Sequence, residues 1–125
     1  MPPKIFITGF GPFEQVAENP SEFLAKRCGL PYGISEVSYD ATRRFLGELD
    51  QCDFDVLLML GAHGQATRFH LEFQAHNRIG AKADVRGYLP PESPIRDGEP
   101  LVMPGTLWSS LELQDIVSDG HAVPS

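Results

Sequence analysis

Apolar runs alternate with amphipathic stretches in the first half of the chain. Residues 4–8 form an apolar, β-branched run that predicts a buried strand. Residues 55–60 are almost continuously apolar, which is typical of a strand covered on both faces. A shorter strand is expected over residues 34–37. The resulting β-α-β-α-β order favours a parallel sheet with helices packed on it.

The first helix is predicted directly after the first strand and its loop. Asn19 is expected to cap it, with Pro20 at the first helical position and Glu22 three residues after the cap. Gly29, followed by Pro31, ends it. We expect its apolar stripe to consist of Phe23, Leu24 and Cys28.

A second amphipathic helix follows the short strand. Asp40 is expected to cap it. Its apolar positions recur at helical spacing and are Ala41, Phe45, Leu46 and Leu49.

The second half of the chain has a different pattern. Residues 69–77 alternate in a way that predicts one half-exposed strand, with Phe69, Leu71, Phe73 and Ala75 on one face and His70, Glu72, Gln74 and His76 on the other. Residues 78–105, rich in Gly, Pro and charge, are expected to be a long excursion outside the core. A short helix is predicted over residues 113–119, and residues 121–125 resemble the approach to a strand that the chain does not complete.

Size and charge narrow the class of protein. The 125 residues suffice for one domain, residues 1–125, and the 42% apolar content is ordinary for a globular chain. A net charge of −7 argues against binding nucleic acid or an anionic membrane. The chain has neither an apolar run of about 18 residues nor the pattern of a signal peptide, so we expect a cytoplasmic protein.

The two cysteines, Cys28 and Cys52, form neither a disulfide framework nor a CxxC motif, and we expect reduced thiols. Cys28 is expected at the C-terminal end of a helix, where the dipole disfavours a thiolate. Cys52 lies among acidic residues, whose negative charges also disfavour a thiolate. Both thiols are therefore expected to be structural.

An aromatic loop is the first candidate site. Gly9, Phe10, Gly11, Pro12 and Phe13 follow the first strand, and ligands of open α/β sheets bind at the carboxyl ends of strands. Two phenylalanines there favour a flat, uncharged ligand, although packing alone also explains such rings. Phosphate binding is not expected, because the third glycine of a dinucleotide loop and the Lys-Ser/Thr of a P-loop are absent.

Glu72 and its neighbours allow two further interpretations. Glu72 could be a solvated strand residue, or it could bind a metal together with His70 and His76, with His63 as a further ligand. Residues four apart on one strand face already lie about 13 Å apart, so a straight strand cannot bring both histidines to one ion. We therefore expect no metal at these residues.

These motifs resemble those of pyroglutamyl peptidase I (pyrrolidone-carboxylate peptidase), a family of cysteine peptidases. The opening motif Thr8-Gly9-Phe10-Gly11-Pro12-Phe13 with Asn19-Pro20-Ser21 and the spacing Gly61-x-x-Gly64-x4-Phe69-x-x-Glu72-x-x-Ala75-x-Asn77 carry the resemblance. Three shorter matches support it, namely Val37-Ser38-Tyr39, Asp55-Val56-Leu57 with Leu60-Gly61, and Ser109-Ser110-Leu111.

The resemblance implies a three-layer α/β/α fold with a mostly parallel twisted sheet. It implies hydrolysis of an N-terminal pyroglutamate from peptides by a Cys-His-Glu triad without a cofactor. Glu72 resembles the triad carboxylate, Phe10 and Phe13 the rings that hold the pyrrolidone, and Asn19 a substrate-binding residue. The chain departs from the family's usual residues at four positions, which are Ala62, Phe69, His70 and Phe73.

The family's nucleophilic cysteine and histidine match no residue of this chain. We therefore expect an N-terminal, truncated part of such an enzyme that is inactive alone, and the alternative is a non-catalytic binding module. Uncovered sheet edges and helix faces would favour a homo-oligomer.

Overall fold

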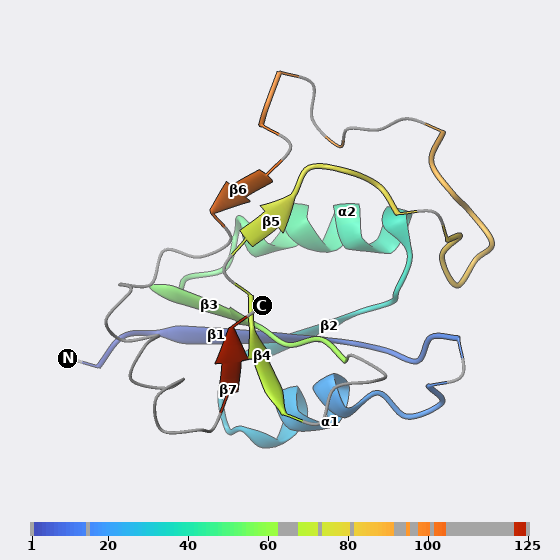
Figure 1. Cartoon of the computed structure of the whole chain (residues 1–125). Helices are drawn as coiled ribbons and strands as arrows, with labels where there is room; N and C mark the ends of the chain where they lie inside the picture. Colours follow the sequence, from blue (N-terminus) through green and yellow to red (C-terminus); the bar gives the residue numbers. More distant parts are fainter. Residues whose placement is uncertain are drawn as a thin grey trace. The chain divides into compact units, whose positions relative to one another are not determined.

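The computed structural model describes residues 2–14, 16–62, 68–72, 74–80, 82–91, 95, 98–100, 102–104 and 122–124 (Figure 1). The chain divides into two compact units. The first consists of Met1–Ala62 with Lys82–Leu89, and the second of His63–Ala81 with Pro90–Ser125. Segment 82–89 therefore belongs to the first unit although it is distant in sequence.

The first unit contains a parallel three-stranded sheet. Its strands are β1 (Ile5–Phe10), β2 (Tyr32–Ser35) and β3 (Val56–Met59), in the order β2-β1-β3. Both neighbours run parallel to β1, with Thr8 opposite Gly33 on one side and Met59 on the other. The β-α-β-α-β order and the parallel sheet predicted from the sequence are confirmed. The strand bounds differ by one or two residues from those expected.

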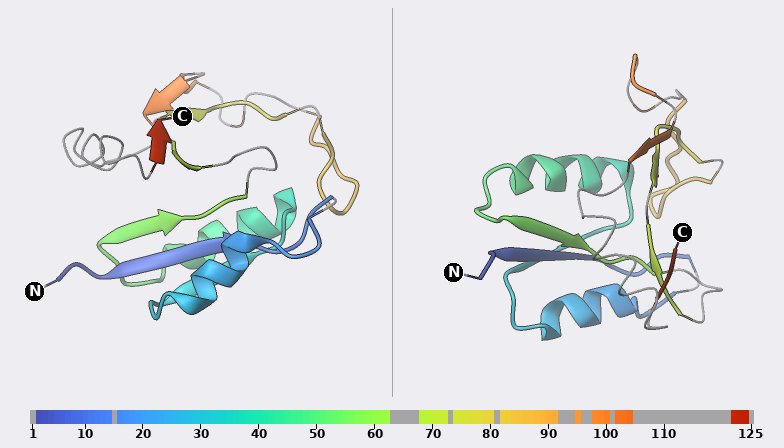
Figure 2. Two further views of the ribbon diagram at one scale, coloured as in Figure 1. Left: turned by 60° about the horizontal axis from the view of Figure 1, so that its bottom comes forward. Right: turned by 60° about the vertical axis from the view of Figure 1, so that its left-hand side comes forward.

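Two helices cover opposite faces of this sheet, α1 (Pro20–Arg27) on one side and α2 (Tyr39–Leu49) on the other (Figure 2). This three-layer α/β/α arrangement confirms the predicted fold class. On the α1 side the core contains Ile7 and Ala25, which are fully buried. On the α2 side Phe45 covers Gly33, whose Cα has no room for a methyl group because the ring carbon would lie 2.7 Å away.

The predicted apolar stripe of α1 is wrong. Ser21 and Ala25 are the buried residues, whereas Phe23 is 54% and Leu24 38% exposed, and Cys28 is exposed as well. The reason is close packing: a Cβ on Gly9 of β1 would lie 2.5 Å from the carbonyl oxygen of Ser21. Only small side chains fit where a helix approaches a strand so closely, so the large residues turn outwards.

The ends of both helices are set by local hydrogen bonds. Asn19 caps α1 as predicted, and Gly29 follows the helix with a positive φ of 73°. The cap of α2, however, is Ser38 and not Asp40. Ser38 is extended (φ −136°, ψ 149°), and its hydroxyl accepts the N–H of Ala41 at 3.1 Å.

Of the predicted apolar positions of α2, Leu49 is buried but Leu46 is 48% exposed. The expectation that the third strand is covered on both faces is also wrong, because Leu58 is 38% and Met59 56% exposed. This strand, β3, lies at one edge of the sheet, and α2 packs on β2 at the other edge.

The described residues of the second unit form four short strands. These are β4 (Phe69–Leu71), β5 (Gln74–His76), β6 (Val102–Pro104) and β7 (Ala122–Pro124). Strand β4 pairs in parallel with β7, and β5 pairs antiparallel with β6.

Three expectations about this half of the chain are thereby corrected. Residues 69–77 form two strands rather than one, because β4 and β5 hydrogen-bond to different partners. Residues 78–105 contain a strand, and residues 121–125 also contain one, since each segment finds a partner strand distant in sequence. The helix predicted over residues 113–119 lies outside the described residues. Within the described part of the chain, no helix has the length and apolar character needed to span a bilayer.

Candidate functional site

The aromatic loop, residues 10–13, follows β1 at its carboxyl end. Phe10 and Phe13 are both half-buried. Phe13 begins a tight turn, in which its N–H donates to Val16 O at 3.2 Å and the N–H of Val16 donates to Phe13 O at 2.7 Å. Glu14 adopts a positive φ of 47° within this turn. The backbone on either side of the Phe13 ring is therefore held by hydrogen bonds.

Asn19 and Ser21 hold the other end of the loop against α1. The Asn19 amide donates from Nδ2 to Gly11 O at 2.9 Å, and its Oδ1 accepts the Ser21 N–H at 3.0 Å and the Ser21 hydroxyl at 2.8 Å. The Ser21 hydroxyl in turn accepts the N–H of Phe10 at 2.9 Å. These two side chains therefore join the loop backbone on both sides of Phe10 to the first turn of the helix.

Asn19 is 3% exposed, and both polar atoms of its side chain bond within the chain. Its role as a helix cap is confirmed, and its contact with a substrate remains a prediction. Ser21, also 3% exposed, was not singled out as a site residue by the sequence analysis. The signal for it lay in the Asn-Pro-Ser triplet, where a serine at the second helical position can turn its hydroxyl back towards the preceding loop.

The aromatic loop is also tied to the loop after β2. Gly11 N–H donates to Ser35 O at 2.9 Å. Because β1 and β2 are parallel, their carboxyl ends meet at one edge of the sheet, and this bond joins the two loops there. The backbone of the aromatic loop is thereby fixed from α1 and from β2.

A buried hydroxyl lies close to this loop in sequence. Thr8 is 2% exposed, and within the described part of the chain its Oγ1 is buried without a hydrogen-bond partner. An unpaired buried hydroxyl costs about 1–3 kcal/mol. Thr8, two residues before Phe10, therefore lowers the stability of the central strand.

Glu72 lies directly after β4 in the second unit and is exposed. Phe10, Phe13 and Asn19 belong to the first unit. The structure therefore brings the two aromatic residues and Asn19 into one loop region. The pairing of Glu72 with that region remains a prediction.

The metal-binding alternative required His70, Glu72 and His76 on one strand. His70 lies in β4 and His76 in β5, with Glu72 between the two strands. His63 lies outside the described residues. Among the residues that the structure describes, no group of three or more His, Cys, Asp or Glu side chains is arranged to hold a metal ion.

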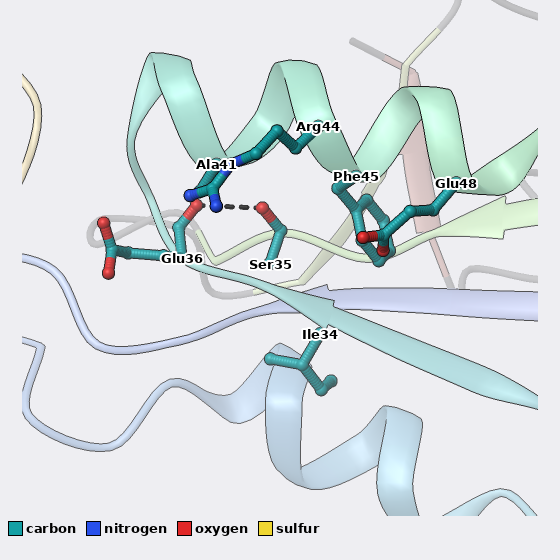
Figure 3. A pocket seen from close by; sticks show the side chains of 7 residues that line it. All are labelled: Ile34, Ser35, Glu36, Ala41, Arg44, Phe45 and Glu48. Carbon is teal, nitrogen blue, oxygen red and sulfur yellow. Dashed lines mark hydrogen bonds between the residues drawn. The ribbon is translucent and has the colours of Figure 1, made fainter.

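A shallow open hollow lies between β2 and α2 (Figure 3). Ser35 points towards α2 and Ile34 towards the opposite face of the sheet, as the alternation of a strand requires. Phe10, Phe13 and Asn19 do not line this hollow. Its lining combines a few apolar atoms with charged side chains and consists of Ile34, Ser35, Glu36, Ala41, Arg44, Phe45 and Glu48. It is therefore distinct from the predicted aromatic slot.

Cys28 and Cys52 are both free and exposed. Cys28 caps the C-terminal end of α1, and Cys52 follows the C-terminal end of α2. In a β-α-β unit a helix ends near the start of the next strand, so both thiols lie at the edge of the sheet opposite the aromatic loop. The expectation that both thiols are structural stays a prediction.

Comparison with protein-family models and with curated protein sequences gives no match. Comparison with solved structures gives similar folds. The pyrrolidone carboxyl peptidase from Thermus thermophilus superimposes with a TM-score of 0.78 at 27% identity, over 97% of this chain and 68% of that chain. The pyrrolidone carboxyl peptidase from Thermococcus litoralis gives 0.81 at 27% identity, over 98% of this chain and 61% of that chain.

A variant of the Pyrococcus furiosus pyrrolidone carboxyl peptidase has a TM-score of 0.81 at 24% identity, and this likeness concerns the fold alone. The present chain spans 61% to 68% of the lengths of these three proteins. The described elements thus adopt the α/β fold of the pyrrolidone carboxyl peptidases, and the resemblance that the motifs around Phe10 and Glu72 indicate is confirmed.

Proposed function

We propose that the aromatic loop of this chain binds the pyroglutamyl residue at the N-terminus of a peptide. The hydrogen-bonded mounting of Phe10 and Gly11 on Asn19 and Ser21 is the observation that carries the proposal. The structural similarity to pyrrolidone carboxyl peptidases supports it. A preorganised loop binds without an ordering cost, which is what a small ligand with few contacts requires.

The chemistry of the loop suits a neutral lactam. Pyroglutamate is a flat five-membered ring without the charge of a free amine, and aromatic rings accept such a group without having to desolvate a charge. The side chains that hold the loop backbone, Asn19 and Ser21, are neutral and already hydrogen-bonded. None of the four residues that form and hold the loop carries a charge that could pair with an N-terminal ammonium group; they are Phe10, Phe13, Asn19 and Ser21. An unblocked peptide is therefore expected to bind more weakly than a pyroglutamyl peptide.

In a complete reaction Glu72 would orient a histidine, which would activate a thiol for attack on the α-carbonyl carbon of the pyroglutamyl residue itself. A carboxylate in that role fixes the imidazole and stabilises the imidazolium ion that forms. The attack forms a thioester and releases the rest of the peptide, and water then hydrolyses the thioester.

The positions of the two cysteines favour binding without hydrolysis as the activity of this chain. Cys28 and Cys52 both follow the C-terminal ends of helices, at the edge of the sheet away from the aromatic loop. We therefore propose that the chain recognises pyroglutamyl peptides, and that cleavage needs a thiol that neither Cys28 nor Cys52 supplies.

Calorimetric titration of the 125-residue chain with a pyroglutamyl dipeptide tests binding. We expect saturable binding that Phe13→Ala weakens by about ten-fold or more, the effect of losing one aromatic contact. Phe23→Ala is the matched control, because Phe23 is 54% exposed on the outer face of α1. Equal affinities of the Phe13→Ala and Phe23→Ala variants, or absence of binding by the unmodified chain, would refute the proposal.

Release of the chromophore from a pyroglutamyl anilide tests hydrolysis separately. We expect no turnover above the background rate. Turnover that Glu72→Ala abolishes and Cys28→Ser or Cys52→Ser reduces would show that the chain is a complete catalyst, contrary to the proposal.

A further inference from the structure

Segment 82–89, here called the strap, is packed on the first unit although the sequence places it in the second half of the chain. It contains a local turn in which Gly87 N–H donates to Asp84 O at 2.9 Å and Asp84 N–H donates to Tyr88 O at 2.9 Å. Gly87 has a φ of 78°, a conformation that glycine adopts without strain. The strap is thus an ordered piece of backbone with its own hydrogen bonds.

The carboxylate of Asp84 joins this turn to the start of α2. Its Oδ1 accepts the N–H of Arg86 at 2.9 Å and that of Tyr88 at 3.0 Å, both within the strap. Its Oδ2 accepts the N–H of Tyr39, the first residue of α2, at 2.9 Å. The rings of Tyr39 and Tyr88 meet edge to face with centroids 6.4 Å apart. One oxygen therefore organises the strap and the other anchors it.

The charge of Asp84 is stabilised in this position. Burial raises the pKa of its carboxyl group, but the three N–H donors together with Arg86 outweigh burial and leave the pKa below its ordinary value. The donor at Tyr39 also belongs to a helix N-terminus, where a negative charge is favoured.

The strap holds the loop between β2 and α2, residues 36–38. Val85 N–H donates to Val37 O at 3.2 Å, and the guanidinium group of Arg86 binds both carboxylate oxygens of Glu36. The residue before this loop is Ser35, whose carbonyl accepts the N–H of Gly11 in the aromatic loop.

A second connection reaches the turn beyond Phe13. Lys82 Nζ lies 3.7 Å from Glu14 Oε1. The side chains of this pair are 83% and 56% exposed, so the pair contributes little by itself. The strap therefore acts on the aromatic loop mainly through residues 35–39.

We propose that Asp84 is a positioning residue: by anchoring the strap to Tyr39, it fixes the loop after β2 and thereby the backbone of the aromatic loop at Gly11. The effect on ligand binding rests on the proposed function, whereas the effect on the Gly11 backbone does not. Asp84 itself contacts neither Phe10 nor Phe13, and its effect on them passes mainly through residues 35–39.

The substitution Asp84→Asn separates the two oxygens. An asparagine retains Oδ1 for Arg86 and Tyr88 but places an NH2 group, itself a donor, opposite the N–H of Tyr39. The local turn is therefore kept and the anchor to α2 is lost. In the 125-residue chain, we expect hydrogen exchange at the amides of Val85 and Gly11 to become about ten-fold faster.

The amide of Leu60 is the internal control. It donates to Thr8 O at 2.9 Å on the other side of β1, away from β2. Its exchange is expected to change by less than that of Gly11. Equal acceleration at Leu60 and Gly11, or unchanged exchange at Gly11, would overturn the positioning role.

Two substitutions of Tyr39 give an independent test in case Asp84→Asn fails to fold. Tyr39→Pro and Tyr39→Ala both remove the ring, but only proline removes the N–H that Asp84 accepts. Proline suits the first helical position, and the extended conformation of Ser38 suits the residue before proline. We expect faster exchange at Gly11 in Tyr39→Pro than in Tyr39→Ala, and equal rates in the two variants would contradict the proposal.

Titration with the pyroglutamyl dipeptide then distinguishes the two proposals. We expect Asp84→Asn to weaken binding by about five-fold through the loss of preorganisation. If the unmodified chain binds and Asp84→Asn binds equally well, the positioning role in recognition is overturned and the proposed function stands. If the unmodified chain does not bind, the proposed function fails, and exchange at Gly11 still decides whether Asp84 positions the loop.

Discussion

Ser21 and Phe10 are joined across the boundary between helix and strand: the Ser21 hydroxyl in the first turn of α1 accepts the N–H of Phe10 at the end of β1, at 2.9 Å. The same hydroxyl donates to Asn19 Oδ1. A helix cap and a candidate binding loop thus share one hydrogen-bond network. Stability of the helix start and order of the loop are therefore expected to change together.

Substitutions of Asn19 can separate these two roles. Asn19→Asp keeps an Oδ1 that caps α1 but replaces the donor to Gly11 O with a second oxygen. We expect a loss of about 1–2 kcal/mol in the free energy of unfolding, with the helical circular dichroism signal retained. Asn19→Ala loses the cap as well and should cost about 1 kcal/mol more. If Asn19→Asp is as stable as the unmodified chain in urea unfolding, the bond to Gly11 contributes nothing.

Gly9→Ala tests the close approach of α1 to β1. The new Cβ would lie 2.5 Å from the carbonyl oxygen of Ser21, a backbone atom that cannot move without shifting the helix. We expect destabilisation of about 2 kcal/mol or more, measured by thermal unfolding.

Gly47→Ala is the matched control for this substitution. Gly47 lies in α2, and nothing is within 4 Å of a Cβ placed there. Alanine is favoured over glycine in a helix by about 1 kcal/mol, so this variant should be more stable than the unmodified chain. Similar changes in the two variants would show that α1 does not contact the strand this closely.

Thr8→Val removes the unpaired hydroxyl of β1 while keeping the β-branched shape. Because Oγ1 is buried without a partner in the described part of the chain, we expect the variant to be about 1 kcal/mol more stable in urea unfolding. A loss of stability would show that the hydroxyl has a partner. Thr8→Ser, which keeps the hydroxyl and loses the methyl group, should be less stable than either.

The strap predicts a pH dependence of stability in acid. The Asp84 pKa is depressed in the folded chain relative to its ordinary value of 3.8, because its N–H donors and Arg86 favour the carboxylate. Glu36, which faces the same guanidinium group, has a pKa lowered by its hydrogen bond to Arg86. Both carboxylates therefore stabilise the fold above their unfolded pKa values, and this stability is lost as pH falls through the folded ones.

The unmodified chain should accordingly lose stability more steeply than Asp84→Asn as the pH falls from about 5 to about 3. The two curves of unfolding free energy against pH are expected to converge at the acid end. Parallel curves would show that the folded chain does not stabilise the ionised form of Asp84.

Sequence patterns predicted the local parts of this fold well. The apolar runs around Ile7 and Leu57 are continuous enough to indicate strands, and Asn19-Pro20 carries its capping chemistry within three residues. The aromatic loop was equally visible, because its glycines and phenylalanines follow the first strand directly. Such features depend on residues that are adjacent in the sequence, so the sequence alone is enough to predict them.

What the sequence did not reveal depends on distant partners. The outward-facing Phe23 contradicts the expected apolar stripe, because the backbone of α1 at Ser21 lies directly against Gly9 of β1. The break between β4 and β5 follows from partner strands near residues 103 and 123, which no period in residues 69–77 encodes.

The strap is a third case. Asp84 accepts a hydrogen bond from Tyr39, which lies 45 positions earlier in the sequence. A carboxylate next to a glycine turn does not indicate which helix it will bind. The sequence alone therefore predicted the features of this chain that depend on local hydrogen bonds and on periodicity. Tertiary packing alone decided which faces are buried, because burial depends on how closely two backbones can approach.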